Sequence, residues 1–236
     1  MPGEVLLSAA NVVRTYRDGV GVRAVRGVSL DLREKDFVAL MGPSGSGKTT
    51  FLGTLAGLDP PDAGEVRWRG RRIGALSRDE TRELRRTGIG MVFQSFGLLP
   101  TLSALENVEL PLRVLGADQT GERAAAALGR LGLEDRLHNR TFELSAGQQQ
   151  RIAVARALVT EPLVLLADEP IAEVDTENAE LILDAMWEVI RRGGAVLAAT
   201  HNPQALRYSN RVVLFRDGAI EAEGSPKELA ERVTTD

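Results

Sequence analysis

The chain contains no cysteine. Disulfide bonds, thiolate metal sites and cysteine nucleophiles are therefore excluded, and the absence fits a reducing compartment. Long hydrophobic runs are also missing: the longest, such as Leu163–Ala167, are about five residues, whereas a membrane-spanning helix needs roughly 20. We therefore expect no segment of this sequence to cross a bilayer. The first five residues have no basic start and no long apolar stretch, so we expect no signal peptide.

A surplus of basic residues is missing as well. Lys and Arg together number 29 against 33 for Asp and Glu, a net charge of −4, whereas dedicated nucleic-acid-binding proteins usually carry a clear basic excess. We therefore expect no nucleic-acid partner. Lysine occurs only at positions 35, 48 and 227, so the location of Lys48 is informative. The 236 residues are 43% hydrophobic and 26% charged, which is ordinary for a globular protein.

Apolar patterns predict strands and helices in alternation. Continuous apolar runs indicate strands buried on both faces, and alternating runs indicate half-buried strands. The expected strands are residues 28–32, 37–41, 66–68 (at a sheet edge), 89–93, 163–167, 195–199, 212–215 and 219–223. The expected helices start near Thr49, Ser77, Ser103, Glu122, Ser145, Thr176 and Pro226. This order is typical of an α/β fold with a mostly parallel sheet and right-handed crossovers.

One internal stretch, about residues 95–160, is nearly all helical in pattern. We expect it to form a helical subdomain that is inserted into the parallel-sheet core. The core itself is then made of residues 1–94 and 161–236. The helix that starts at Ser77 is expected to reach about Arg86 before the next strand begins.

Residues 42–49 match the G-x-x-x-x-G-K-[ST] pattern of phosphate-binding loops. Glycines let the backbone wrap a phosphate chain, successive N–H groups form an anion nest, and the following helix presents its positive end. Lys48 is expected to reach the β- and γ-phosphates, and the Thr49 hydroxyl to bind Mg²⁺. The motif alone indicates only that a nucleoside triphosphate binds, since kinases, GTPases and motor ATPases share it. The candidate residues are Gly42, Pro43, Ser44, Gly45, Ser46, Gly47, Lys48, Thr49 and Thr50.

Two acidic residues, Asp168 and Glu169, follow the buried strand at 163–167. Ligands of open parallel sheets bind at the carboxyl ends of the strands. Asp168 is therefore expected to hold Mg²⁺, directly or through water. Glu169 faces another direction and is expected to orient and deprotonate an attacking water molecule. A solvated acidic turn is the competing interpretation.

A second anion site is predicted at Ser145, about a hundred residues after the phosphate loop. Ser145 is a plausible helix N-cap, so free N–H groups begin at Ala146. One nucleotide offers one γ-phosphate, and the phosphate loop already grips one side of it. The economical arrangement is a two-fold dimer in which each nucleotide lies between the loop of one chain and the Ser145 helix of the other.

With these motifs in place, the sequence strongly resembles the ATP-binding subunit of an ABC transporter over nearly its whole length. Residues 144–151 are similar to the signature segment of that family, with Ala146 where glycine is usual. The resemblance implies a phosphate-loop core with an N-terminal antiparallel β subdomain and an inserted helical subdomain. It also implies ATP hydrolysis with Mg²⁺, a homodimer, membrane-spanning permease-type partners, and a peripheral location on the cytoplasmic face of the membrane through those partners.

The resemblance also assigns roles to single residues. Tyr16 resembles the aromatic residue that stacks on adenine, and Gln94 the glutamine that contacts Mg²⁺ or the lytic water. His201 resembles the histidine that contacts the γ-phosphate, and Asp175 the aspartate that touches the opposite subunit. Each has a simpler alternative: an edge-strand aromatic, a strand-end cap, a cap of the Asn202 turn, and a helix cap. The residues expected to bind ATP across the dimer are Ser145, Ala146, Gly147, Gln148 and Asp175.

Residues 90–108 narrow the resemblance to the lipoprotein-release and macrolide-export group, with cell-division ATPases as close relatives. The groove near Gln94 is expected to receive a membrane subunit, with Phe96, Leu98 and Leu99 either as its apolar contacts or as core of the helical subdomain. Two residues, Ile171 and Glu173, depart from the common family pattern, which puts contacts across the dimer in doubt. A soluble ABC-type ATPase that remodels a cytosolic complex or nucleic acid is the alternative function. A small-molecule kinase would not explain the Ser145 segment.

Overall fold

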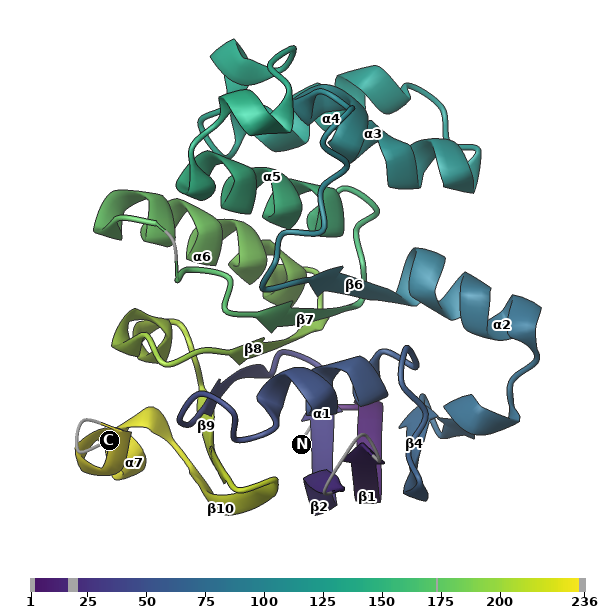
Figure 1. Cartoon of the computed structure of the whole chain (residues 1–236), viewed down its shortest axis with the longest axis vertical. Coiled ribbons are helices and arrows are strands. Elements are labelled where there is room, and N and C mark those ends of the chain that lie inside the picture. The colour runs from purple at the N-terminus through teal and green to yellow at the C-terminus, as the bar shows by residue number, and fades with distance from the viewer. Residues whose placement is uncertain (1–2, 17–20, 173, 234–236) are drawn as a thin grey trace.

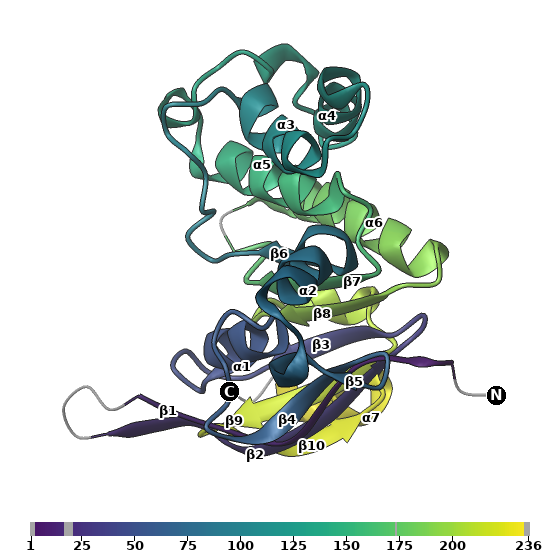
Figure 2. The same cartoon turned by 90° about the vertical axis from the view of Figure 1, so that its right-hand side faces the viewer.

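The computed structural model of the chain describes residues 3–16, 21–172 and 174–233. Two β-sheets form the part of the molecule that contains both termini, and a group of helices lies beyond them (Figures 1 and 2). Glu173, one of the two departures from the family pattern, lies outside the described residues. Within the described residues, every helix is too short or too polar to span a bilayer.

The smaller sheet is antiparallel and has the strand order β2-β1-β4-β5. Its strands are β1 (Val5–Tyr16), β2 (Val22–Arg33), β4 (Ala63–Trp68) and β5 (Arg71–Arg72). The expected N-terminal antiparallel β region is therefore confirmed. The expectation that residues 66–68 lie at the sheet edge is wrong, because the two-residue strand β5 pairs with Arg67 and Trp68 on the outer side.

The larger sheet has the strand order β10-β9-β3-β8-β7-β6. Its strands are β3 (Phe37–Met41), β6 (Ile89–Val92), β7 (Val164–Asp168), β8 (Ala195–Ala199), β9 (Arg211–Arg216) and β10 (Ala219–Gly224). All neighbouring pairs are parallel except the β9–β10 hairpin, so the predicted mostly parallel sheet is confirmed. β7 extends one residue further than expected and includes Asp168, whereas β6 ends before Phe93.

Helices cover both faces of the larger sheet (Figure 1). The helices of the chain are α1 (Lys48–Leu55), α2 (Arg78–Glu83), α3 (Ala104–Leu115), α4 (Thr120–Gly129), α5 (Ala146–Leu158), α6 (Thr176–Arg191) and α7 (Pro226–Val233). α3 and α4 pack on α5, away from the sheet (Figures 1 and 2). The capping boxes expected at Ser77 and Ser103 are formed, and the expected N-cap Ser145 forms a capping box with Gln148 as well. After α2, residues 84–88 continue in a wider π-helical turn instead of the single helix to Arg86 that the sequence predicts.

The strands of the larger sheet distribute their side chains between two cores. Leu165 and Ala167 of β7 belong to the cluster that contains α3–α6, whereas Val164 and Leu166 belong to the cluster with α1 and the smaller sheet. Because both faces are buried, residues 164–167 of the strand are all apolar. The cluster that contains Leu165 and Ala167 includes residues of α3–α5 as well as of α6 and the sheet. Since this shared packing draws no boundary around residues 95–160, their division into a helical subdomain stays a prediction.

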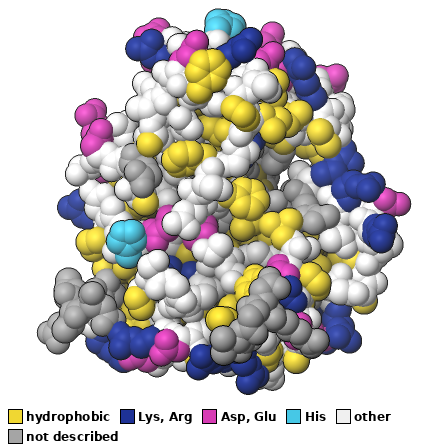
Figure 3. All heavy atoms as spheres, viewed as in Figure 1, with side chains coloured by type: hydrophobic (Ala, Val, Ile, Leu, Met, Phe, Trp, Pro, Cys, Tyr) yellow, Lys and Arg dark blue, Asp and Glu magenta, His cyan; other side chains and the backbone are white. Residues whose placement is uncertain are grey.

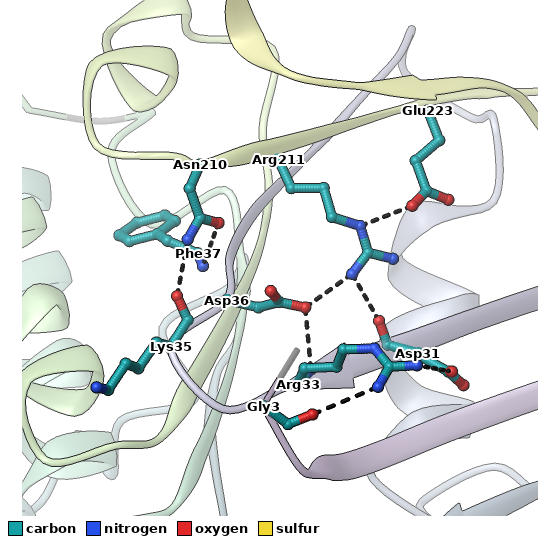
Figure 4. A network of polar contacts seen from close by, with 9 residues as sticks. All are labelled: Gly3, Asp31, Arg33, Lys35, Asp36, Phe37, Asn210, Arg211 and Glu223. Atoms are coloured by element: carbon teal, nitrogen blue, oxygen red, sulfur yellow. Dashed lines mark hydrogen bonds and ion pairs between the residues drawn. The ribbon is translucent and has the colours of Figure 1, made fainter. Parts of the chain in front are cut away.

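A polar network joins the two sheets close to the start of β3 (Figure 4). Arg211, at the start of β9, bonds the Asp36 carboxylate at 2.7 Å, the Asp31 carbonyl at 2.8 Å and the Glu223 carboxylate at 2.7 Å. Asn210 accepts from the Phe37 N–H at 3.0 Å. These contacts hold the turn between β2 and β3 against β9. They therefore fix the start of β3, the strand that leads into residues 42–47.

Candidate nucleotide-binding site

The loop of residues 42–47 connects β3 to α1, as the phosphate-loop motif predicts. Two of its glycines are required by the packing of the backbone. A Cβ on Gly42 would lie 2.0 Å from the Phe215 carbonyl oxygen, and a Cβ on Gly47 would lie 2.1 Å from that of Ala24. Gly47 also has a φ of 103°, which side-chain-bearing residues rarely adopt. The loop is therefore held close to β2 and β9.

The Lys48 ammonium is folded into this loop. It donates to the Gly42 carbonyl at 2.7 Å and to the Pro43 carbonyl at 3.0 Å, and the residue is only 7% exposed. Burial lowers the pKa of Lys48, while the charges of Glu169 and Asp168 act in the opposite direction. The site thus holds a nearly buried cation whose partners are neutral carbonyls, an arrangement in which an anionic ligand would be strongly favoured.

Thr49 and Asp168 meet at the ends of α1 and β7. The Thr49 hydroxyl donates to the Asp168 carboxylate at 2.7 Å, and Asp168 is 2% exposed. Burial raises the pKa of Asp168, and the charge of Glu169 raises it further; the Thr49 hydrogen bond and the Lys48 charge lower it. A hydroxyl and a buried carboxylate at this distance form an oxygen-lined position suited to a hard cation.

Glu169 follows β7 in a strained backbone conformation, with a φ of 48°. Its N–H donates to the Ala199 carbonyl at 2.8 Å, which ties the residue to β8. One carboxylate oxygen, Oε1, lies 3.0 Å from the Nδ1 atom of His201. The other oxygen, Oε2, is buried and has no hydrogen-bond partner. His201 therefore contacts Glu169 rather than capping the turn at Asn202, whose own side chain accepts from the Gln204 N–H.

A cavity of about 270 Å³ collects most of the predicted residues. Its lining consists of Tyr16, Ala24, Ser44, Gly45, Gly47, Lys48, Thr49, Thr50, Gln94, Asp168 and Glu169. Five separate parts of the chain therefore meet around one space: the end of β1, β2 at Ala24, the phosphate loop with the start of α1, the segment after β6, and the end of β7. Sequence reasoning missed Ala24, because nothing in the pattern of β2 shows that its backbone passes the loop. His201 borders a neighbouring hollow with Gly42 and Pro43.

The Ser145 turn lies apart from this cavity. Ser145 caps α5: its hydroxyl accepts from the Gln148 N–H at 3.3 Å, and its own N–H donates to the Gln148 side chain at 2.9 Å. None of residues 145–148 lines the cavity of the same chain. Asp175 caps α6 by accepting from the Asn178 N–H at 2.9 Å, and this bond is the main reason why the pKa of Asp175 is lowered. The helix-cap alternative for Asp175 is thus confirmed.

A groove of about 440 Å³ lies between α3, α5 and the end of α1. Figure 3 shows hydrophobic side chains gathered across the middle of this face of the molecule. Three large exposed residues line the groove: Leu58 (46% exposed), Phe93 (37%) and Val114 (58%). Phe96, Leu98 and Leu99, the expected apolar contacts, do not line this groove, so their contact with a membrane subunit stays a prediction. Leu98 packs against the buried cluster instead.

The positions of Leu110 and Val114 are the sequence feature from which this groove could have been predicted. They are four residues apart on α3 and both line the groove, outside the stripe of Val108 and Leu112 that faces the core. Ile171, the other departure from the family pattern, is fully buried in the cluster that contains α5 and α6. An apolar residue at position 171 is therefore accounted for by packing.

The sequence pattern of the ABC transporter family matches residues 25–172. This range includes the phosphate loop, the Ser145 turn and the acidic pair. The chain belongs to the ABC transporter family. It is an ATP-binding cassette and an ATPase of that family.

Relatives of the cassette support the expected macrolide-export group. It is 44% identical over 224 residues to the macrolide export ATP-binding/permease protein MacB of Syntrophobacter fumaroxidans, a match that covers 92% of this chain and 31% of the relative. It is 44% identical over 219 residues to an ABC transporter ATP-binding protein of Thermotoga maritima, covering 92% and 94%. The cassette thus spans about a third of the MacB relatives and nearly all of the Thermotoga protein.

Solved structures confirm the fold. A dimeric structure of a post-hydrolysis state of the ATP-binding cassette MJ0796, bound to ADP and Pi, has a TM-score of 0.88 at 38% identity and covers 94% of this chain and 99% of that one. The structure of cbiO1 from Clostridium perfringens, part of the ABC transporter complex cbiONQ, has a TM-score of 0.81 at 28% identity and covers 98% and 93%.

Proposed function

We propose that the cassette binds ATP with Mg²⁺ in the cavity beside the phosphate loop, hydrolyses it between two copies of the chain, and transmits the motion to a membrane-spanning permease-type subunit. The observation that carries the proposal is the meeting of Lys48, Thr49, Asp168 and Glu169 at the carboxyl ends of parallel strands. This is where ligands of such sheets bind.

The phosphates of ATP would take the place of the loop carbonyls around Lys48. The N–H groups of residues 44–50 and the positive end of α1 add to the attraction. Tyr16, at the end of β1, lines the same cavity and is 39% exposed, so its ring is available for stacking on the base. The proposed ATP-binding residues of one chain are therefore Tyr16 and residues 42–50.

The donor set fits Mg²⁺. The Thr49 hydroxyl and the Asp168 carboxylate are 2.7 Å apart, and the Gln94 side chain lines the same cavity. Hydroxyl, amide and carboxylate oxygens are the ligands that magnesium prefers. When bound, the ion would neutralise charge on the phosphates. We propose Thr49, Gln94 and Asp168 as the residues that hold it.

Glu169 is the proposed general base. Its buried Oε2 is without a partner, whereas Oε1 is held by His201, so one oxygen remains for the proton of an attacking water. His201 has 71% of its side chain exposed. It is therefore free to contact the γ-phosphate while it keeps Glu169 oriented, and Gln94 completes the proposed catalytic set.

The other side of the nucleotide is supplied by a second copy. The Ser145 turn presents free N–H groups at a helix start but lies outside the cavity of its own chain, so Ser145, Ala146, Gly147 and Gln148 would bind the partner's ATP. Asp175 would touch the opposite copy while it caps α6. The dimeric state named for the MJ0796 cassette supports this arrangement.

The apolar groove is the proposed docking site for the membrane subunit. Leu58, Phe93 and Val114 expose large apolar side chains around it, which is typical of an interaction surface. Relatives are named ATP-binding/permease proteins, so the partner is proposed to be a permease-type subunit that holds the cassette at the cytoplasmic face of the membrane. Export, lipoprotein release and mechanical force transmission all fit, because the partner determines the cargo.

Two substitutions test the ATPase site. Lys48→Ala is expected to weaken Mg²⁺-ATP binding in titration calorimetry, because it removes the buried cation. Glu169→Gln is expected to keep ATP binding but to lower turnover by about 10²–10⁴-fold, and to accumulate an ATP-bound dimer in size-exclusion chromatography. Glu83→Gln, at an exposed residue of α2, is the matched control. Near-normal turnover of Glu169→Gln would refute Glu169 as the base, and unchanged ATP affinity of Lys48→Ala would refute the phosphate site.

A further inference from the structure

Tyr16, at the end of the interior strand β1, is held in place by Arg14 of the same strand and by Asp59 of the connection after α1. Its hydroxyl donates to the Asp59 carboxylate at 2.7 Å. The Arg14 guanidinium carbon lies 5.2 Å from the centre of the Tyr16 ring, within the range of a cation–π contact. The ring is thus fixed at its hydroxyl end and covered by a cation, although the side chain is partly exposed.

The same two residues bind each other. The Arg14 Nε atom donates to Asp59 Oδ2 at 2.9 Å, and a second guanidinium nitrogen lies 2.5 Å from Asp59 Oδ1. This two-point contact between a guanidinium and a carboxylate fixes the orientation of both groups. Arg14 also pairs with Asp62 at 3.2 Å, and Asp62 accepts from the Thr15 N–H at 2.6 Å. Tyr16, Arg14 and Asp59 therefore form a closed triangle.

Asp59 and Asp62 belong to the connection that leaves α1, the helix that begins at Lys48. Two prolines separate them, Pro60 and Pro61, and prolines restrict the backbone of themselves and of the preceding residue. The Asp59 N–H donates back to the Gly53 carbonyl of α1 at 3.2 Å. The end of α1 that is remote from the phosphate loop is thus linked by a stiff connection to Tyr16.

The linkage to α1 fixes the side of the Tyr16 ring on which the base of a nucleotide would stack. Tyr16 lines the phosphate-loop cavity and Arg14 does not. A base that extends from the phosphates would therefore stack on the ring from the cavity, while Arg14 supports the ring from its own strand. Because the ring is already ordered, less conformational freedom is lost when the base binds.

We propose, on the basis of the function proposed above, that Asp59 and Arg14 are positioning residues that hold Tyr16 as a preformed platform for the base of ATP. Neither lines the cavity with the phosphate-binding residues. The affinity for the base portion of ATP should therefore depend on them, whereas the affinity for the triphosphate portion should not.

The experiment compares two ligands, ATP and inorganic tripolyphosphate, each with Mg²⁺ in titration calorimetry. Tripolyphosphate occupies the phosphate loop without a base. Tyr16→Ala is expected to weaken ATP binding about 5- to 150-fold, the range for loss of one base–aromatic stack. Asp59→Ala is expected to weaken ATP binding about three- to tenfold, through loss of the hydrogen bonds that order the ring. Both variants should bind tripolyphosphate like the unchanged chain.

Two further variants sharpen the test. Tyr16→Phe keeps the ring and removes the hydroxyl that bonds Asp59, so it should weaken ATP binding about as much as Asp59→Ala, and the double variant should be little weaker than either. Asp79→Ala removes an aspartate of α2 whose side chain is 90% exposed and pairs with Arg82. It is the matched control and should bind both ligands normally.

The outcomes are distinct. Unchanged ATP affinity of Asp59→Ala, beside a weakened Tyr16→Ala, would overturn the positioning role and leave the proposed function intact. Equal weakening of ATP and tripolyphosphate by Asp59→Ala would also overturn it, because that pattern indicates general damage to the fold. If Lys48→Ala bound tripolyphosphate normally, the phosphate site of the proposed function would fail instead.

Discussion

Thr49 and Asp168 are 119 residues apart in the sequence, yet their side chains are joined by a hydrogen bond of 2.7 Å. Each was predicted from its own neighbourhood, Thr49 from the phosphate-loop motif and Asp168 from its place after a buried strand. Their proximity depends on the order β3-β8-β7, in which the parallel strands end at the same edge. Sequence patterns do not specify strand order, so only the structure could join them.

The buried charge of Asp168 leads to a prediction about stability. Burial raises the pKa of this carboxyl group, so the ionised form is disfavoured in the folded state and the charge destabilises the protein without ligands. Asp168→Asn is expected to raise the melting temperature at neutral pH by about 2–4 °C, the shift that corresponds to about 1 kcal/mol in a chain of this size. Differential scanning fluorimetry without nucleotide or Mg²⁺ measures it.

The sign of the pH dependence follows from the direction of the pKa shift. Because the folded-state pKa of Asp168 lies above the unfolded one, the penalty is complete above the folded value and disappears as the pH falls through it. The stability gain of Asp168→Asn should therefore shrink on acidification. Asp79→Asn, at an exposed aspartate, is the control. A gain that persisted unchanged at acid pH would show that removal of the charge is not its cause.

Among the elements, α5 joins two parts of the proposed machinery. It begins at the Ser145 cap and carries Arg156 near its other end. The Arg156 guanidinium donates to the Phe96 carbonyl at 2.8 Å and to the Gly97 carbonyl at 2.6 Å. Burial lowers the pKa of Arg156, and the two bonds give this partly buried cation its partners. The helix that carries the signature segment is thus connected to the loop that follows Gln94.

The other end of this loop is held by α3. Asn107 is fully buried, and its side chain accepts from the Leu99 N–H at 2.8 Å and donates to the Leu99 carbonyl at 3.1 Å. Phe96 and Gly97 both have left-handed backbones, with φ near 60° and 59°. A loop of this shape needs partners for its carbonyl groups, and Arg156 and Asn107 supply them.

Arg156→Ala is therefore expected to lower ATPase turnover about three- to tenfold, because two charge-assisted hydrogen bonds that position the Gln94 loop are lost. ATP affinity should change by less than about twofold, since Arg156 is not part of the ATP cavity. Steady-state kinetics and titration calorimetry measure the two quantities separately. Arg156→Lys, which can keep one donor in place, should recover part of the turnover.

Arg82→Ala, at an exposed arginine of α2, is the matched control for this prediction and should leave turnover unchanged. If Arg156→Ala lowered ATP affinity and turnover in the same proportion, its effect would be a general loss of structure. Normal turnover would mean that α5 does not position the Gln94 loop.

At the scale of the whole molecule, the apolar groove predicts how the cassette meets its partner. Val114 is 58% exposed on the groove wall. Val114→Glu places a charge in an apolar interface and is expected to reduce co-purification with the permease-type subunit in detergent by at least about tenfold. ATP binding by the isolated cassette should be unchanged, because Val114 lies outside the ATP cavity.

Val22→Glu is the comparison for this experiment, because Val22 is similarly exposed, at 62%, and lies outside the groove. It should co-purify like the unchanged chain. If Val114→Glu retained the membrane subunit as well, the docking surface would lie elsewhere on the cassette. If both variants lost it, the effect would reflect added negative charge rather than the groove.

Features that depend on neighbouring residues were predicted from the sequence, whereas contacts between residues distant in the chain were not. The capping boxes at Ser77 and Ser103 and the N-cap at Ser145 were predictable because each depends on residues within three positions of one another. The sequence left open whether Phe96, Leu98 and Leu99 are docking contacts or core, because only the packing decides which apolar side chain faces the core. Leu98 packs against the core, whereas Leu99 is 44% exposed. Asp59 escaped prediction for the same reason: its partner Tyr16 is 43 residues away.

The sequence by itself determined the succession of strands and helices along the chain, the phosphate loop, and the acidic pair after a buried strand, because these depend on spacing along a few residues. Gln94 and His201 were assigned only through the resemblance to the ABC transporter family. The tertiary structure decided strand order, the pairing of Glu169 with His201, the platform around Tyr16 and the walls of the groove. The physical reason is that these features depend on which buried surfaces pack together. Such contacts join residues far apart in the chain, and no local pattern specifies them.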